Sequence, residues 1–135
     1  MHSLTESYKV FTGLPVQNIT SATATAGTGV DCLEMGLNCS AILNLGTQTA
    51  LTSSTVKIQE SDVVGSGYAD IPGAVFAATD ADDDDKVAAI DFIRTKRFIR
   101  VVDTTVGTVT AHNVGVNLLV EAGKGGAALN SATAA

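Results

Sequence analysis

Short segments in which apolar and polar residues alternate recur along the chain, and Gly, Asp, Asn and Ser separate them. The clearest is residues 55–61, where Val56 and Ile58 face one side while Lys57 and Gln59 face the other. A period of two is typical of a half-buried β-strand. We expect about eight short strands, drawn from residues 16–25, 29–32, 41–45, 55–61, 68–70, 74–78, 87–93, 98–102, 105–111 and 114–121.

The segments between these strands indicate how they connect. Residues 98–102 are nearly all apolar, which predicts a central strand covered on both faces. Residues 94–97 look like the turn of a hairpin joining 87–93 to 98–102, and residues 112–113 like a turn before 114–121. One turn of helix within 87–93 is the alternative, because Ala88, Ala89 and the capping residue Asp85 permit it.

The fold class follows from many short strands without long helices. An antiparallel β-sandwich or jelly roll fits this pattern better than a closed barrel. A parallel α/β sheet would need strands that alternate with helices. The 135 residues suit one domain. We expect an extended N-terminal arm over 1–15, the sandwich over 16–122 and a flexible C-terminal tail over 123–135. Removing 1–14 is then expected to leave the fold intact.

Composition narrows the choice of core and partner. The chain is 45% hydrophobic but 4% aromatic and lacks Trp, so aliphatic side chains must fill the core around Phe11, Phe76, Phe92 and Phe98. The net charge of −6 disfavours nucleic acid as a partner. No targeting segment and no apolar run of membrane-spanning length are visible, so we expect a product of the cytosol with no membrane partner.

The cysteines and histidines do not form a metal-binding pattern. Cys32 and Cys39 are the only cysteines, and a cytosolic origin favours free thiols that pack in or near the core. A metal site needs about four ligands, whereas His2 and His112 lie far away in the sequence. No cofactor is expected.

Candidate catalytic residues are equally weak. The acidic run within 80–85 lacks the spacing of an EF-hand, so a solvated loop is favoured over a calcium site. His112 lies beside an expected turn and suits a surface or edge position better than a general base. Glu60, Asp62 and Asp70 lack the aromatic platforms of a glycosidase. Nucleophile-elbow and phosphate-loop motifs are absent, so we expect no enzyme and no small-molecule substrate.

Three segments together resemble a protein family. The run VKIQESD at 56–62, then YADIPGA at 68–74 and KRFIRVV at 96–102, resembles the small head proteins of tailed bacteriophages in order and spacing. The resemblance covers roughly 29–121. It implies a jelly-roll cement, or decoration, protein that lies on the outer surface of the virion capsid and contacts the major capsid protein. It also implies a homodimer or homotrimer, since such proteins occupy local symmetry axes.

The basic residues of the last segment are the candidate interface. Arg94, Lys96, Arg97 and Arg100 lie within seven residues, and they would pair either with an acidic capsid surface or with the protein's own aspartates. A solvated face is the ordinary alternative for such a cluster. A carbohydrate-binding or adhesive sandwich of a phage fibre or tail is the second functional hypothesis. The absence of Trp counts against it, because sugars stack on aromatic rings.

Overall fold

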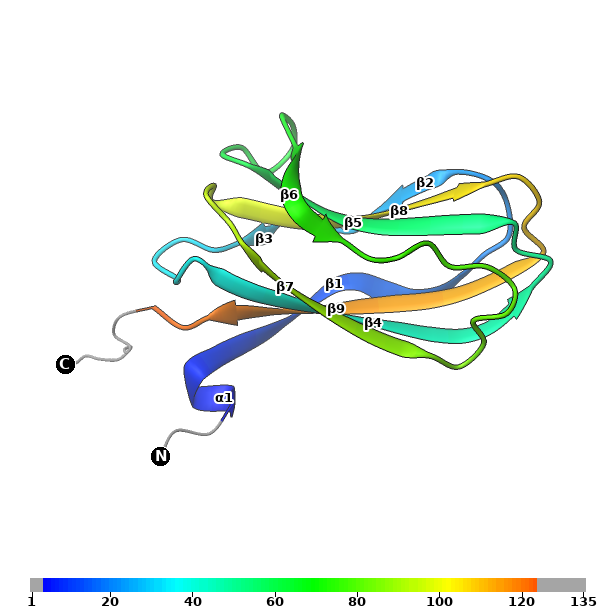
Figure 1. The fold of residues 1–135 in the computed structure, drawn as a ribbon. Coiled ribbons are helices and arrows are strands. Elements are labelled where there is room, and N and C mark those ends of the chain that lie inside the picture. Colours follow the sequence, from blue (N-terminus) through cyan, green and yellow to red (C-terminus); the bar gives the residue numbers. More distant parts are fainter. Residues whose placement is uncertain (1–3, 124–135) are drawn as a thin grey trace.

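Residues 4–123 are described by the computed structural model, and they form two antiparallel sheets packed face to face (Figure 1). Sheet A has the strand order β1-β9-β4-β7; sheet B has the order β2-β8-β5-β6, with β3 also paired to β8. This is the order of a jelly roll, so the expected fold class is confirmed. The elements are α1 (Leu4–Ser7), β1 (Tyr8–Ile19), β2 (Ala24–Ala26), β3 (Val30–Asp31), β4 (Asn38–Thr49), β5 (Ser53–Ser61), β6 (Ala69–Val75), β7 (Val87–Ile93), β8 (Phe98–Val106) and β9 (Ala111–Glu121).

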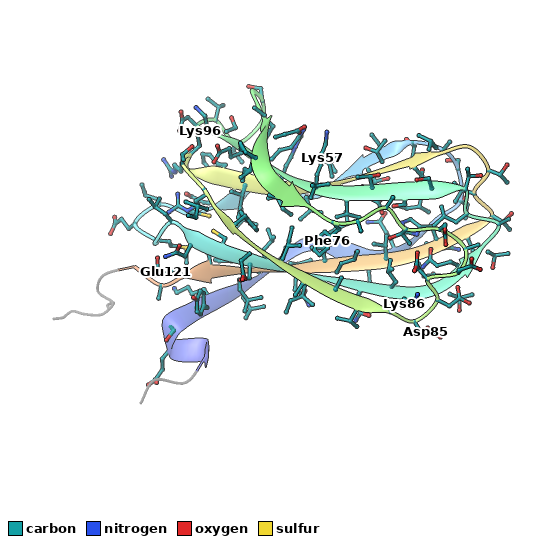
Figure 2. All side chains as sticks on the ribbon, viewed as in Figure 1. Lys57, Phe76, Asp85, Lys86, Lys96 and Glu121 are labelled. Carbon is teal, nitrogen blue, oxygen red and sulfur yellow. The ribbon has the colours of Figure 1, made fainter. Side chains whose placement is uncertain are left out.

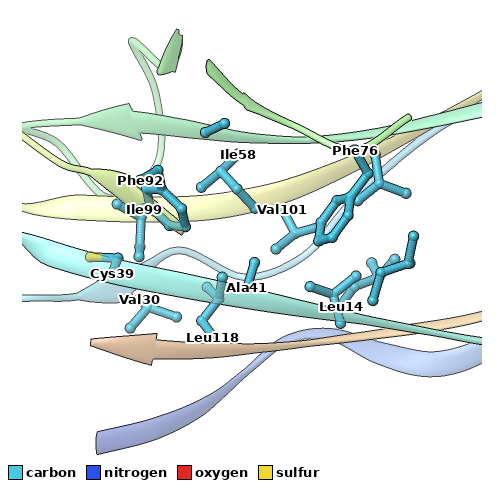
Figure 3. Close-up of a cluster of buried hydrophobic side chains, with 14 of the residues drawn as sticks. Leu14, Val30, Cys39, Ala41, Ile58, Phe76, Phe92, Ile99, Val101 and Leu118 are labelled. Carbon is cyan, nitrogen blue, oxygen red and sulfur yellow. The ribbon is translucent and has the colours of Figure 1, made fainter. Parts of the chain in front are cut away.

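The sequence alternation determines which side chains enter the space between the sheets. In β5, Val56 and Ile58 are buried while Lys57 and Gln59 on the opposite face are half-buried. The other long strands supply the rest of the core in the same way (Figure 3). Phe76 and Phe92 project into this layer among the smaller aliphatic side chains. Each fully buried Val, Leu or Ile contributes roughly 1.5–3 kcal/mol relative to exposure.

The N-terminal segment differs from the expectation. Residues 8–15 belong to β1, which pairs with β9 from Tyr8 onward, so the expected arm over 1–15 is wrong for them. Leu14 is 1% exposed and lies in the core. Burial of this side chain stabilises the pairing of residues 8–15 with β9. A bulge on each side of Leu14 adjusts the register, and an added Cβ on Gly13 would lie 2.6 Å from Val101. The expected tail lies outside the described residues from 124 onward.

Two expected turns are also wrong. Val87–Ile93 lies in sheet A and Phe98–Val106 in sheet B, so residues 94–97 cross between the sheets and do not close a hairpin. The helical alternative for 87–93 is wrong too. His112 and Asn113 lie inside β9; the turn before β9 contains Gly107, whose positive φ of 76° suits glycine. Among residues 4–123, no helix is long and apolar enough to cross a membrane.

Candidate interaction surfaces

Arg94 is a buried structural residue and does not offer its charge to a partner. Arg94 is only 6% exposed. The guanidinium donates hydrogen bonds to four carbonyl oxygens, those of Cys32, Met35, Gly36 and Lys96, at 2.6–3.0 Å. It therefore holds the loop between β3 and β4 against the crossing segment. The prediction of Arg94 as an interface residue was wrong, because the residue is buried and these contacts use four of its five N–H donors.

The other three basic residues are paired within the molecule. Arg97 makes two hydrogen bonds of 2.8 Å to Asp31. This contact comes first among the causes that lower the pKa of Asp31 to about 2, ahead of the Leu33 N–H. Lys96 lies 3.3 Å from Asp62, and both side chains remain well exposed. For Lys96 and Arg97 these contacts match the hypothesis of pairing with the protein's own aspartates, whereas Arg100 donates to the Gln59 side chain.

Glu60 is a buried anchor that the sequence did not reveal. It is 7% exposed, and its carboxylate accepts hydrogen bonds from the Thr95 N–H, the Thr95 hydroxyl and the Lys96 N–H. These contacts use both oxygens. The side chain therefore positions the crossing segment from the β5 side, as Arg94 does from the other side.

The acidic run folds back on its own backbone. Asp83 accepts from the Asp80 N–H at 2.9 Å and lies 2.9 Å from the Lys86 ammonium, and these contacts lower its pKa. Asp84 accepts from the Gln48 N–H at 2.8 Å. Within residues 4–123, no group of three or more His, Cys, Asp or Glu side chains is arranged to hold a metal ion. Asp85 and Lys86 mark this loop at one end of the sandwich (Figure 2).

The two cysteines are free and buried, as expected of small core side chains. Cys32 is 0% exposed and Cys39 is 2% exposed. Burial is the main cause that raises the pKa of both thiols, for Cys39 to about 12. Both side chains are therefore protonated at neutral pH and poorly nucleophilic.

His112 is fully buried, so its expected surface position is wrong. Its ring lies between the sheets with Asp103 and Ser54 of sheet B and Gln48 of sheet A; Asp103, Ser54 and His112 are all 0% exposed. Nε2 lies 2.6 Å from Asp103 Oδ2, and Nδ1 lies 2.5 Å from Gln48 Oε1. The Ser54 hydroxyl donates to Asp103 Oδ1. We call these four residues the buried network.

Proton positions in the buried network follow from Gln48. Its Nε2 donates to the carbonyl oxygens of Gly46 and Asn113, so its Oε1 must accept, and His112 Nδ1 carries a proton. His112 Nε2 faces Asp103 Oδ2 at 2.6 Å and the Ser54 hydroxyl oxygen at 3.1 Å. Although a serine, a histidine and an aspartate meet here, the hydroxyl already donates to the carboxylate and none of the three is exposed. The arrangement ties the sheets together.

The outer face of sheet A is a broad surface with little charge. Its outward side chains form rows across the four strands, because register places residues of β1, β9, β4 and β7 opposite one another. In that strand order the rows are Tyr8, Glu121, Asn38, Ile93; Val10, Leu119, Ser40, Asp91; Thr12, Asn117, Ile42, Ala89; and Val16, Gly115, Asn44, Val87. We call this set face A.

Face A exposes apolar side chains and carries few charges. Val10, Val16, Val87 and Ile93 are 57%, 84%, 65% and 61% exposed. Its two carboxylates are already partnered, since Asp91 accepts from the Ser40 hydroxyl and Glu121 from the Asn38 amide. A hollow of about 430 Å³ lies at one end, lined by Tyr8, Asn38, Cys39, Ser40, Asp91, Phe92 and Ile93.

The outer face of sheet B, which we call face B, carries more charged side chains than face A. Lys57 lies 3.1 Å from Asp70, whose pKa is lowered by hydrogen bonds from Gln59 and then Lys57. Arg100 donates twice to Gln59 Oε1, and its guanidinium lies 4.2 Å from the Tyr68 ring centroid. Figure 2 shows Lys57 and Lys96 projecting on this side, away from sheet A.

These contacts give the family resemblance a structural meaning. Its first and third segments lie on β5 and β8, which are neighbouring strands. The polar residues that define the motifs bond one another across that pair and to the residues near β6. The motifs therefore describe how sheet B is built.

Comparison with known proteins shows the fold. Similar solved structures include the PBSX exported protein XepA, with 16% identity and a TM-score of 0.63, covering 91% of this chain and 39% of that one. The structure of the Gx strain of infectious bursal disease virus has 11% identity and a TM-score of 0.58, and the match covers 87% of this chain and 32% of that one. The VP2 subviral particle of the same virus has 11% identity and a TM-score of 0.55, with the same coverage.

The chain thus spans well under half the length of each of these three proteins. At such identities the likeness concerns the jelly-roll fold alone. No protein-family model matches the chain, and no curated protein sequence matches it significantly.

Proposed function

We propose that this chain is a structural protein of a bacteriophage head, a cement protein that binds the outer capsid surface through face A. In this role it stabilises contacts between neighbouring major capsid proteins. The motif resemblance to small phage head proteins supports the proposal. So does a fold also found in the PBSX exported protein XepA and in a viral VP2 subviral particle.

The contrast between the two faces carries the argument. Face B pairs several charges in contact with water and exposes Val75 and Val106 at 48% and 52%, whereas face A exposes three valines and an isoleucine at 57–84% and carries only two carboxylates. Contiguous exposed apolar surface costs free energy in water and commonly marks an interaction site. Protein interfaces are depleted in charged residues at their centre, which is the composition of face A. This contrast moves the proposed interface away from the basic cluster.

The carbohydrate-binding alternative gains no comparable support from the described residues. The Tyr68 ring, an aromatic surface on the side of face B, is covered by the guanidinium of Arg100, 4.2 Å from the ring centroid. A sugar would have to displace that cation to stack there.

The test uses expanded capsids of the encoding phage, assembled from the major capsid protein alone. The wild-type chain should sediment with these shells and raise their melting temperature. Val10→Glu and Val16→Glu should each weaken binding by at least about tenfold, because a charge replaces a buried valine at the contact. Val106→Glu is the matched control, because Val106 is 52% exposed but lies on sheet B.

Two results would remove the proposal. One is a wild-type chain that stays in the supernatant with intact expanded shells. The other is equal binding by the wild type and both face A variants. Circular dichroism and thermal melting of each variant would verify that the substitutions leave the fold unchanged.

A further inference from the structure

The four ends of the two sheets are not equally protected against pairing with another chain. β1 contains Pro15 and two bulges, and β6 contains Pro72, Gly73 and a register shift. β2 and β3 span only three and two residues. Prolines, bulges and short length are the usual protections of an edge strand. β7 has none of them: it runs for seven residues in unbroken register with β4 and contains no Pro, Gly, Lys or Arg.

The backbone of β7 presents free hydrogen-bonding groups along its outer edge. The Leu45 N–H donates to the Lys86 carbonyl, and the Arg94 N–H donates to the Leu37 carbonyl. Hydrogen-bonded pairs alternate in an antiparallel ladder, so even-numbered residues of β7 bond to β4. The N–H and C=O groups of Val87, Ala89, Asp91 and Ile93 therefore point to the open edge. Within residues 4–123 no hydrogen-bond partner is recorded for them.

We propose that β7 pairs antiparallel with β7 of a second copy, joining two A sheets into one continuous sheet across a two-fold axis. This proposal goes beyond capsid binding and does not depend on it. A two-fold axis requires the two residue numbers of each pair to have a constant sum. With a sum of 180, Val87 lies opposite Ile93 of the second copy, and Ala89 lies opposite Asp91.

Charge and contact favour this register over its neighbours. A sum of 182 would place Asp91 directly opposite Asp91 of the second copy, and like charges in that position are destabilising. A sum of 178 would leave Ile93 without a partner and place Val87 against Asp91. The favoured register pairs two exposed apolar residues and uses every edge-facing group, giving about eight hydrogen bonds. It also makes the two A faces continuous, since Val87 and Ile93 belong to face A.

The first experiment measures association of the full chain by sedimentation equilibrium up to about 1 mM. The wild type should dimerise. Ala89→Pro should abolish dimerisation, because it removes an edge-facing N–H that β4 does not use. Val10→Pro is the matched control, since it removes an edge-facing N–H from β1 at the other end of sheet A and should leave the dimer intact.

The second experiment tests the register with two charges at one exposed position. Ala89→Lys places a cation opposite Asp91 of the second copy twice per dimer, and Ala89→Asp places an anion there. The Kd should fall for Ala89→Lys and rise for Ala89→Asp, each by about 2- to 30-fold. A monomeric wild type, or the reverse order of the two variants, would overturn the inference. If the chain dimerises but does not bind capsids, only the proposed function is refuted. If it binds capsids as a monomer, only the β7 pairing is refuted.

Discussion

Replacing His112 with leucine tests whether the buried network ties the two sheets together. The substitution removes the partner of the Asp103 carboxylate and of the Gln48 amide oxygen, both held between the sheets. Breaking one side of a fully buried charge-assisted pair costs about 3–5 kcal/mol, because the other side is left without a partner. A domain of this kind has roughly 5–15 kcal/mol of total stability. The melting temperature should fall by about 10–20 °C.

The decisive measurement is a double-mutant cycle with Asp103→Leu, followed by urea unfolding. Each single variant should lose about 3–5 kcal/mol, so independent effects would sum to about 6–10 kcal/mol. Because both substitutions remove the same pair, the double variant should lose several kcal/mol less than that sum. Additivity within about 0.5 kcal/mol would refute the reasoning, and so would single losses below about 1 kcal/mol.

A milder variant keeps the test readable if the leucine variants are largely unfolded. Ser54→Ala removes one neutral donor to Asp103 and preserves the histidine contact. Its expected cost is about 1–3 kcal/mol, which leaves most of the molecules folded. Thr55→Ala is its control, since this neighbouring side chain faces away from the core.

Two further predictions follow from the N-terminal strand and the surface charges. Deleting residues 1–7 should preserve cooperative unfolding, whereas deleting 1–14 should abolish it by removing most of β1; Leu14→Ala alone should cost about 2–5 kcal/mol. Because the pKa of Asp31 falls from 3.8 to about 2 on folding, its stabilising contribution is present above pH about 4 and lost as the pH falls towards 2. The melting temperature of the wild type should therefore approach that of Asp31→Asn over this interval; a gap that stays constant between pH 5 and 2 contradicts the assignment.

The sequence predicted the parts of the fold that depend on local pattern. Alternation over 55–61 and the apolar run at 87–93 identified β5 and β7, and the two-layer class followed from the number of short strands. Residues 8–15 of β1 were missed, because Gly13 and Pro15 are ordinary signals of a loop; the expected strand at 16–25 included only the last residues of β1. In the structure, two bulges accommodate both residues and return Leu14 to the core.

The functional residues were harder to predict, because their partners are distant or lack a side-chain signature. The partners of His112 lie 9, 58 and 64 residues away, so no local pattern identifies them. Alternation with Val114 and Val116 does place its side chain on the buried face of β9, but the expected turn at 112–113 hid this. Arg94 bonds to backbone carbonyls, which every residue type provides equally. Local turn signals also fail to distinguish a hairpin from a connection between sheets. Face A had a visible sign: Val87, Ala89 and Ile93 make β7 apolar on its outward side too.

The position of β9 has a consequence for biosynthesis. This strand lies between β1 and β4 in sheet A. The ribosome makes β1 and β4 before β9, and neither can pair with β9 until residues 111–121 have emerged. Sheet A is therefore completed only after β9 has been translated, through pairing of strands that lie far apart in the sequence. Such long-range closure is slow, and during it the nascent β1 and β4 segments remain available to chaperones.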